Sequence, residues 1–267
     1  MRFLLVRPDQ VDASLVTFDP RQSHYLLHVL RRKHEDDLTV VIATEETAIE
    51  GRLVWRKTGH VFMEIVRRSI LPPARRPSLT LAVGVLKENK LEEVARQATE
   101  LGVARLSFIS SDRAVPRRKS EGARDRRLEE IVWNACQQSG NPRPPTIVHH
   151  DSVEAFLTGG FDARARLVVA VASGGDPLVD QHLDTERDVI LMVGPEGDFS
   201  EREVEQVRDF GGQSLTIPGY VLRAETACVV LATLVLERMG RFESLVAGVS
   251  VPGENPGKPP RSDPSDG

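Results

Sequence analysis

The 267-residue chain has few cysteines, few aromatic residues and no long apolar run. Its two cysteines, Cys136 and Cys228, lie in apolar patterns of helical spacing, and no Cys-x-x-Cys pair is present, which argues against a disulfide scaffold or a structural zinc site. The longest nearly apolar stretch, residues 227–236, is much shorter than the ~20 residues that cross a bilayer. We therefore expect a cytoplasmic protein without a membrane span.

Signature motifs of several common enzyme classes are also absent. The chain has no P-loop, no Gly-x-Gly-x-x-Gly turn, no His-Glu-x-x-His pair and no Gly-x-Ser-x-Gly elbow, which argues against kinases, Rossmann dehydrogenases, zincins and serine hydrolases. His24 and His28 have the spacing of two metal ligands on a helix, but no third ligand is evident, and we expect no metal. Cys136 shares an apolar helical stripe with Ile131 and Ala135, which favours a core position over a nucleophile.

What the chain does have is enough apolar residues for a large core and an uneven distribution of charge. With 40% hydrophobic and 28% charged residues, it fits one large or two modest globular domains. Residues 1–145 hold 25 Lys and Arg against 19 Asp and Glu, whereas residues 146–267 hold 10 against 20. The basic front half is compatible with a polyanionic partner, and equally with a solvated surface that has no partner.

The first part of the chain, residues 1–70, reads as a small β-barrel domain. Short β-type runs cover residues 2–6, 37–43, 47–57 and 60–67. One helix interrupts them, with Asp19 as its expected N-cap and Pro20 as its first residue. Its apolar stripe comprises Tyr25, Leu26, Val29 and Leu30. Residues 71–78 contain three prolines and are predicted to be a stiff linker.

Strands and helices alternate over residues 79–245, which predicts an α/β domain with a largely parallel sheet. Ser200 and Glu203 form a capping box, after which Val204, Val207 and Phe210 are expected to supply a buried face. The nearly all-apolar residues 224–239 predict a helix buried at the centre or at a subunit interface. Residues 246–267, rich in proline and glycine, are predicted to be a disordered tail. Strands are predicted at residues 79–85, 105–109, 167–172, 189–193 and 213–217, and apolar stripes predict helices that end at Gly102 and Gly140.

Two segments follow predicted strands and carry polar groups. The first is Gly194-Pro195-Glu196-Gly197, which precedes a capped helix. Turn chemistry alone favours a structural turn between strand and helix. The alternative is a turn whose glycines let a ligand approach the backbone closely. The second places Arg223, Glu225 and Thr226 at the start of the apolar helix, where the arginine requires an anion or water. Both segments lie at carboxyl ends of strands, where open α/β sheets bind ligands.

Together these segments resemble the paired signature of the ribosomal small subunit methyltransferase E family. Further matches in the same order extend the resemblance to about residue 243: His24 with residues 29–31, residues 87–90, residues 98–103, Arg113 with Val115, and residues 138–140. The resemblance implies an α/β fold with a C-terminal trefoil-knotted SPOUT methyltransferase domain that has a largely parallel sheet, preceded by a small PUA-like β-barrel domain. It also implies a homodimer that methylates N3 of a uridine in 16S ribosomal RNA with S-adenosylmethionine.

The resemblance further implies roles for individual residues. Arg223 would stabilise the uracil anion, while Glu196, Glu225 or water would accept the N3 proton. The substrate would be 16S rRNA or the small ribosomal subunit. The cofactor-binding positions are Val171, Ala172, Gly194, Glu196, Gly197, Ile217, Gly219 and Leu222. The RNA-binding positions are His24, Arg31, Arg32, Lys33, Arg113, Arg117, Arg118 and Lys119.

Three residues depart from the family pattern: Asp198 stands where a second glycine is usual, and Pro218 and Tyr220 lie where the family has Leu-Gly-x-Arg. They keep open an rRNA-binding assembly factor that has lost catalysis. A knotted ribose 2′-O-methyltransferase is a second alternative, which the signature around Arg223 disfavours.

Overall fold

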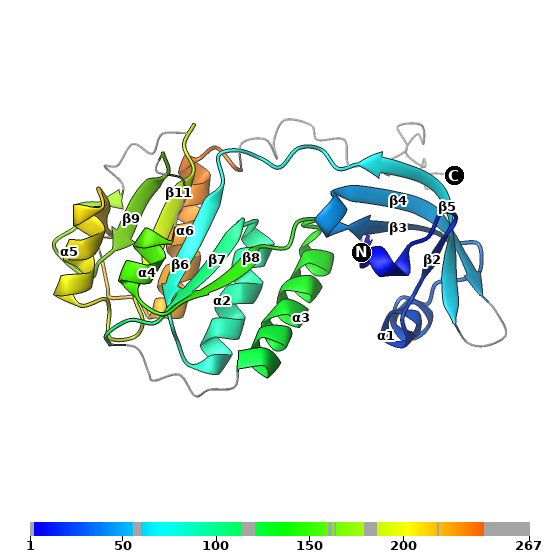
Figure 1. Ribbon diagram of the computed structural model, residues 1–267, viewed down its shortest axis with the longest axis horizontal. Helices are drawn as coiled ribbons and strands as arrows, with labels where there is room; N and C mark the ends of the chain where they lie inside the picture. The colour runs from blue at the N-terminus through cyan, green and yellow to red at the C-terminus, as the bar shows by residue number, and fades with distance from the viewer. Residues whose placement is uncertain are drawn as a thin grey trace, which may run out of the picture.

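The computed structural model describes residues 3–55, 60–113, 121–159, 162, 164–178, 186–217 and 219–242. These residues form two sheets that lie side by side along the longest axis, with helix α3 (Glu121–Ser139) next to the smaller sheet (Figure 1). The predicted tail lies outside the described residues. Over the part of the chain that is described, no helix has both the length and the apolar character needed to cross a membrane.

The smaller sheet is mixed and curled. Its order is β1-β3-β4-β5-β2, in which β1 is parallel to β3 and the other pairs are antiparallel. A register shift at Glu50 and Gly51 bends β4 against β5, as a β-bulge does. The inner face holds a compact apolar cluster around Leu4, Val16 and Met63. The strands are β1 (Leu4–Leu5), β2 (Leu15–Thr17), β3 (Asp37–Ile42), β4 (Thr47–Trp55) and β5 (Val61–Ile70), with the 3-10 turns η1 (Pro8–Gln10) and η3 (Ala43–Glu45).

The helix of this first region begins as the sequence predicts. In α1 (Pro20–His24), the Asp19 carboxylate accepts a 2.7 Å hydrogen bond from the Gln22 N–H, and Pro20 is the first residue. The chain then widens into the π-turn η2 (Tyr25–Val29), closed by the Leu30 N–H on the Tyr25 carbonyl. Leu26 is buried, but Val29 is exposed, so its predicted place in the apolar stripe was wrong. The π-turn rotates each residue less than an α-helix does, and the 3.6-residue period fails there.

The larger sheet is parallel throughout, which confirms the prediction for this region. Its order is β10-β12-β9-β11-β6-β7-β8, and its central strands are buried on both faces. The strands are β6 (Leu79–Gly84), β7 (Arg105–Ile109), β8 (Thr146–His150), β9 (Arg166–Ala170), β10 (Asp176–Pro177), β11 (Val189–Val193) and β12 (Gln213–Thr216).

Helices cover both faces of the larger sheet. One apolar cluster joins Leu81 and Leu191 to helices α2, α3 and α6, and the other joins Ile190 and Met192 to helices α4 and α5, so alternate strand residues serve opposite layers. Helix α2 ends at Gly102, as predicted. The helices are α2 (Glu88–Leu101), α3, α4 (Val153–Thr158), α5 (Glu201–Asp209) and α6 (Ala224–Arg238).

Helix α5 confirms its predicted start and contradicts one predicted contact. Ser200 and Glu203 form the expected capping box, and Val204 and Val207 are buried. Phe210, however, is 51% exposed, because α5 ends at Asp209 and Phe210 is its C-cap residue, where the helical period no longer sets the direction of the side chain. Periodicity extended beyond the last helical residue therefore gave a wrong prediction for Phe210.

The two sheets share one apolar core at their junction. Phe3, Leu5 and Val41 of the smaller sheet belong to the cluster that includes Val132 and Cys136 of α3. The Leu5 N–H also donates a buried 3.2 Å hydrogen bond to Gln137 Oε1. The smaller sheet is thus packed directly against α3, in addition to its covalent connection through residues 71–78.

Candidate active site

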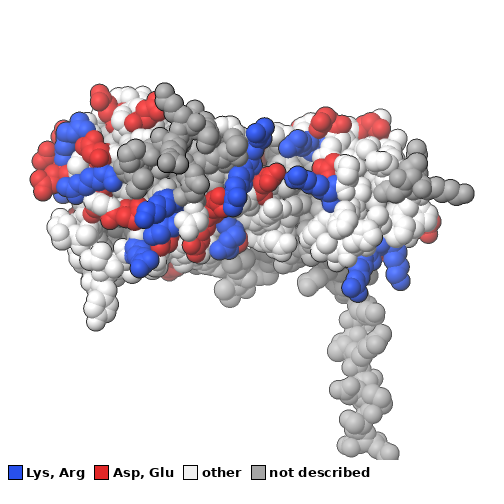
Figure 2. Space-filling model, turned by 90° about the horizontal axis from the view of Figure 1, so that it is seen from below, with Lys and Arg blue, Asp and Glu red and all other residues white. Residues whose placement is uncertain are grey.

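Three loops meet at the carboxyl edge of the larger sheet. They follow β9, β11 and β12, which are neighbours in the order β12-β9-β11 and run parallel, so the loops emerge side by side. The Val171 N–H donates a 2.9 Å hydrogen bond to the Leu215 carbonyl, which ties the first loop to β12. Figure 2 looks onto this edge from below and shows basic and acidic side chains interleaved across it. The positions predicted to bind a cofactor, in residues 171–172, 194–197 and 217–222, all lie in these loops.

The loop after β11, residues 194–200, is tightly constrained, and we call it the closed loop. The Asp198 N–H donates to the Pro195 carbonyl (2.9 Å), and Asp198 Oδ1 accepts from the Phe199 N–H (2.8 Å). Asp198 adopts a left-handed φ of 61°. The loop lies against Gly84 at the end of β6, where an added Cβ would come within 2.7 Å of the Pro195 nitrogen. A side chain at position 84 is therefore incompatible with this closed loop.

The residues after β7 hold the closed loop from outside. Arg113 donates a 3.2 Å hydrogen bond to the Gly197 carbonyl, and the Asp112 N–H donates to the buried Glu203 carboxylate (2.9 Å). Hydrogen bonds from the Ser200 hydroxyl and from Arg202 hold the pKa of Asp112 below its ordinary value. Arg113, predicted to contact RNA, thus also braces the closed loop.

Lys90, at the start of α2, connects the two signature segments. Its ammonium lies 3.0 Å from Glu225 Oε2 and 3.7 Å from Glu196 Oε1. Burial alone would raise the pKa of Glu225, but the residue's own N–H, Lys90 and Arg223 outweigh it and lower that pKa. The Glu225 side chain is 15% exposed and the Glu196 side chain 35%, so Glu225 is the more enclosed carboxylate.

The sequence did not assign Lys90 to the site. It lies within the matched residues 87–90, and that match was the signal available. Its pairing with carboxylates more than a hundred positions away depends on how β6 and β11 lie next to each other, which local patterns do not contain.

The loop after β12, residues 217–223, is sparsely bonded, and we call it the open loop. Gly219 has a φ of 133°, a conformation that favours glycine. Tyr220 is 96% exposed, and Val221 and Arg223 are exposed as well. Among the described residues, the N–H groups of Tyr220, Val221 and Leu222 find no hydrogen-bond acceptor. Pro218 lies outside the described residues. The open loop thus presents main-chain donors and the exposed guanidinium of Arg223, which makes no capping hydrogen bond to α6, at the site.

The remaining predicted RNA-binding residues lie far along the chain from the loops. His24 is exposed on α1, with its ring 4.6 Å from that of His28. Arg31 and Lys33 are exposed and Arg32 is partly exposed, just beyond η2. They are carried by the smaller sheet's region, whereas Arg113 is at the edge of the larger sheet. Arg117, Arg118 and Lys119 lie outside the described residues.

Comparison with known proteins defines the class. Residues 74–236 match the family described as RNA methyltransferase domain, which is more than half of the chain. The chain belongs to this family of RNA methyltransferases.

Curated relatives carry a narrower name. Ribosomal RNA small subunit methyltransferase E 2 of Borreliella burgdorferi is 27% identical over 218 residues, 80% of this chain and 88% of that protein. Ribosomal RNA small subunit methyltransferase E of Mycobacterium tuberculosis is 30% identical over 186 residues, 64% of this chain and 67% of the relative. Within its family, the chain is a member of the ribosomal RNA small subunit methyltransferase E group.

Solved structures share the fold. The ribosomal RNA small subunit methyltransferase E from Neisseria gonorrhoeae bound to S-adenosyl methionine has a TM-score of 0.76 at 22% identity, covering 89% of this chain and 97% of that chain. A probable rRNA-methyltransferase from Porphyromonas gingivalis has a TM-score of 0.76 at 24% identity, covering 90% and 99%. The arrangement of both sheets is thus common to these proteins.

Proposed function

We propose that this protein transfers a methyl group from S-adenosylmethionine to N3 of a specific uridine in 16S ribosomal RNA. The observation that carries the proposal is the meeting of the closed and open loops, joined through Lys90, at the carboxyl edge of a parallel sheet. The relatives are named as methyltransferases of ribosomal RNA, and two similar structures, from Neisseria gonorrhoeae and Legionella pneumophila, contain bound S-adenosylmethionine, which supports this molecule as the methyl donor. The proposed place of action is the cytoplasm, where that RNA is found.

The loops suit the donor in the kinds of contacts they offer. Among the described residues, the N–H groups of the open loop have no acceptor and nothing crowds Gly219, whereas the closed loop is held by its own hydrogen bonds. When bound, S-adenosylmethionine supplies an electrophilic methyl group on its sulfonium. A trefoil knot around these loops is part of the proposal. The residues that would hold the donor are Val171, Ala172, Gly194, Glu196, Gly197, Ile217, Gly219 and Leu222.

Arg223 is the proposed stabiliser of the uracil anion. Loss of the N3 proton spreads negative charge over O2 and O4, and a guanidinium aimed at that charge can lower the barrier by about 3 kcal/mol. Arg223 is the N-cap residue of α6, and its side chain makes no capping hydrogen bond there. Its guanidinium is therefore available to a substrate.

Glu196 is the proposed proton acceptor. The 3.0 Å pair with Lys90 occupies the enclosed Glu225 carboxylate, whereas Glu196 lies farther from the same ammonium and is more exposed. A carboxylate that an ammonium holds ionised accepts a proton less readily. Glu225 and Lys90 would then position the loops, and Glu196 would receive the N3 proton.

RNA contacts and a homodimer complete the proposal. His24, Arg31, Arg32 and Lys33, with Arg113, would bind rRNA phosphates, and Arg117, Arg118 and Lys119 are assigned the same role. The homodimer would bury helix α6, which is apolar on nearly every side, together with exposed apolar residues next to it such as Val221.

The test is nucleoside mass spectrometry of 16S rRNA from a strain without the gene. We expect one N3-methyluridine to be lost, to return with the wild-type gene and to remain absent with Arg223→Ala. An unchanged nucleoside content overturns the proposal. Calorimetry with S-adenosylmethionine separates the assembly-factor alternative, which a lack of donor binding would favour.

A further inference from the structure

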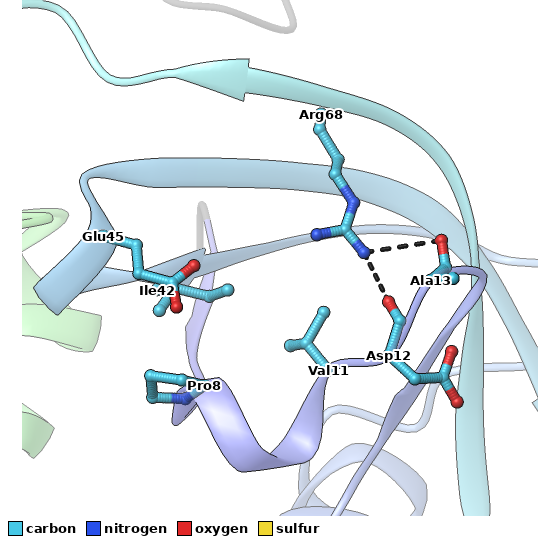
Figure 3. Close-up of a pocket in the computed structure, with 7 residues that line it drawn as sticks. All are labelled: Pro8, Val11, Asp12, Ala13, Ile42, Glu45 and Arg68. Atoms are coloured by element: carbon cyan, nitrogen blue, oxygen red, sulfur yellow. Dashed lines mark hydrogen bonds between the residues drawn. The ribbon is translucent and has the colours of Figure 1, made fainter.

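The smaller sheet has a hollow that none of the predicted site residues line. It has a volume of about 430 Å³ and opens at one end of the curled sheet, between η1, the end of β3 and the outer part of β5 (Figure 3). Small-molecule sites typically enclose roughly 300–1,000 Å³ and occur at the mouths of β-barrels. The size and place of the hollow therefore fit a small group such as a single nucleobase.

Arg68 of β5 extends over this hollow and is held there. One terminal nitrogen of its guanidinium donates to the Asp12 carbonyl and reaches the Ala13 carbonyl at 3.5 Å (Figure 3). Among the described residues, no carboxylate lies within ion-pair distance of Arg68. Among the same residues, the N–H groups on Nε and on the second terminal nitrogen have no hydrogen-bond acceptor. In Figure 3 that second nitrogen points into the hollow.

The two carbonyls that hold Arg68 are themselves fixed. Asp12 Oδ1 accepts hydrogen bonds from the N–H groups of Ser14 (2.9 Å) and Leu15 (2.7 Å), which locks the turn before β2. The Asp12 carboxylate is thereby used within the turn, and Figure 3 shows it directed away from the hollow. The guanidinium is consequently preorganised without being neutralised.

The other walls combine apolar surface with one acceptor. Pro8, Val11 and Ile42 supply the apolar part, and Glu45 of η3 lies on a different side of the hollow from Arg68 (Figure 3). In the described part of the chain, the Glu45 carboxylate has no hydrogen-bond donor or cation as partner. An occupant must therefore accept hydrogen bonds on one side, donate them on another and tolerate apolar contact.

We propose that the hollow binds an unstacked guanine base of the RNA substrate. Guanine offers O6 and N7 as a pair of acceptors for an arginine, and its N1–H and N2 amino group are donors for a carboxylate. Recognition of RNA commonly uses splayed bases held on their edges in this way. A phosphate fits Arg68 but is repelled by Glu45, so the pair of side chains distinguishes the two ligands. The inference rests on the proposed function, since it takes RNA as the partner.

The test compares two pairs of variants in binding to a 16S rRNA transcript at fixed salt. Arg67, next to Arg68 on β5, is paired with Glu50 at 2.6 Å and is the matched control. We expect Arg68→Ala to weaken binding about 10-fold, as loss of one hydrogen bond from a charged donor does, and Arg67→Ala to weaken it much less. Glu45→Gln weakens binding and Glu50→Gln leaves it unchanged. Tighter binding by Glu45→Gln indicates a phosphate in the hollow and overturns the proposal.

A transcript made with 7-deazaguanosine tests the same contact without changing the protein. Removal of N7 weakens binding to the wild-type protein but causes no further loss in Arg68→Ala, and an equal loss in both proteins contradicts the proposal. If the wild-type protein binds only the small ribosomal subunit, the same variants are compared on that particle, and if it binds neither the transcript nor the subunit, the proposed function fails as well. If it binds and methylates the transcript while Arg68→Ala behaves like Arg67→Ala, only the guanine site is excluded.

Discussion

The closed loop and the open loop belong to the same edge of the same sheet, yet they are constructed in opposite ways. The closed loop is bonded internally, lies against Gly84 and is braced by Arg113. The open loop exposes Tyr220 and Arg223 and leaves three successive N–H groups without partners among the described residues. The closed loop therefore has a shape set by its own hydrogen bonds, whereas the open loop has main-chain donors that a ligand could use.

Arg223→Ala should produce the largest effect, and it should affect activity. Under the proposed mechanism, loss of the guanidinium removes about 3 kcal/mol of stabilisation from the uracil anion, equivalent to a fall in kcat of about 100-fold. Because Arg223 is exposed and its side chain does not cap α6, the thermal unfolding midpoint should stay the same. Single-turnover methylation measures the rate, and thermal unfolding measures the stability. A large loss of stability without loss of activity would contradict the proposed difference between the open loop and the closed loop.

Gly84→Ala should show the reverse behaviour. An added Cβ meets the backbone and ring of Pro195, and overpacking of this kind costs about 1–3 kcal/mol of unfolding free energy. Urea unfolding measures the change. Gly122→Ala is the control, since a Cβ there meets no atom of the described neighbouring residues within 4 Å. Equal unfolding free energies for the two variants would show that the closed loop shifts to accommodate the added Cβ at little cost.

Acid should weaken the link between the loops through Glu225. The folded pKa of Glu225 is lower than its ordinary value of 4.5, so its contribution to stability is present above that value and is lost as the pH falls through the folded pKa. The urea-unfolding free energy of the wild type should therefore decrease below about pH 4.5 more steeply than that of Glu225→Gln. Lys90→Met should flatten the same part of the profile, because it removes a main cause of the low pKa. Parallel profiles would contradict a structural role for the pair.

Tyr220→Ala should have the smallest effect on stability. The side chain is 96% exposed and forms no hydrogen bond or ring contact with any described residue, and such surface changes usually lie within about 0.5 kcal/mol. Thermal unfolding at low protein concentration measures it, with Phe210→Ala as a half-exposed aromatic control on the same domain. A clear loss of stability would mean that the open loop is packed after all.

Local signals predicted the parts of the fold that depend on neighbours in the chain. Asp19 with Pro20 marked a helix start, Ser200 with Glu203 marked another, and Gly102 marked an end, since each acts through backbone groups within four residues. Val29 and Phe210 were predicted wrongly, because a π-turn and an early helix end changed the direction of their side chains. These errors left the overall architecture unaffected.

The candidate site shows a sharper limit. The sequence pointed to the loop residues, and the structure brings them together at one edge, but their roles remain predictions. Lys90 and the hollow under Arg68 were outside the reach of sequence patterns, since both arise where segments distant in the chain meet. The parallel pairing of β6 with β11 and the curl of the smaller sheet produce these meetings.

The core shared by Leu5, Val41 and helix α3 has a consequence for target choice. Because the smaller sheet packs on α3 through buried contacts, these contacts oppose any change in the spacing between Arg31 on one lobe and Arg223 on the other. Under the proposed function, a ribosomal nucleotide is then selected by its distance from a second RNA contact at Arg31. That distance requirement adds to any recognition of individual bases.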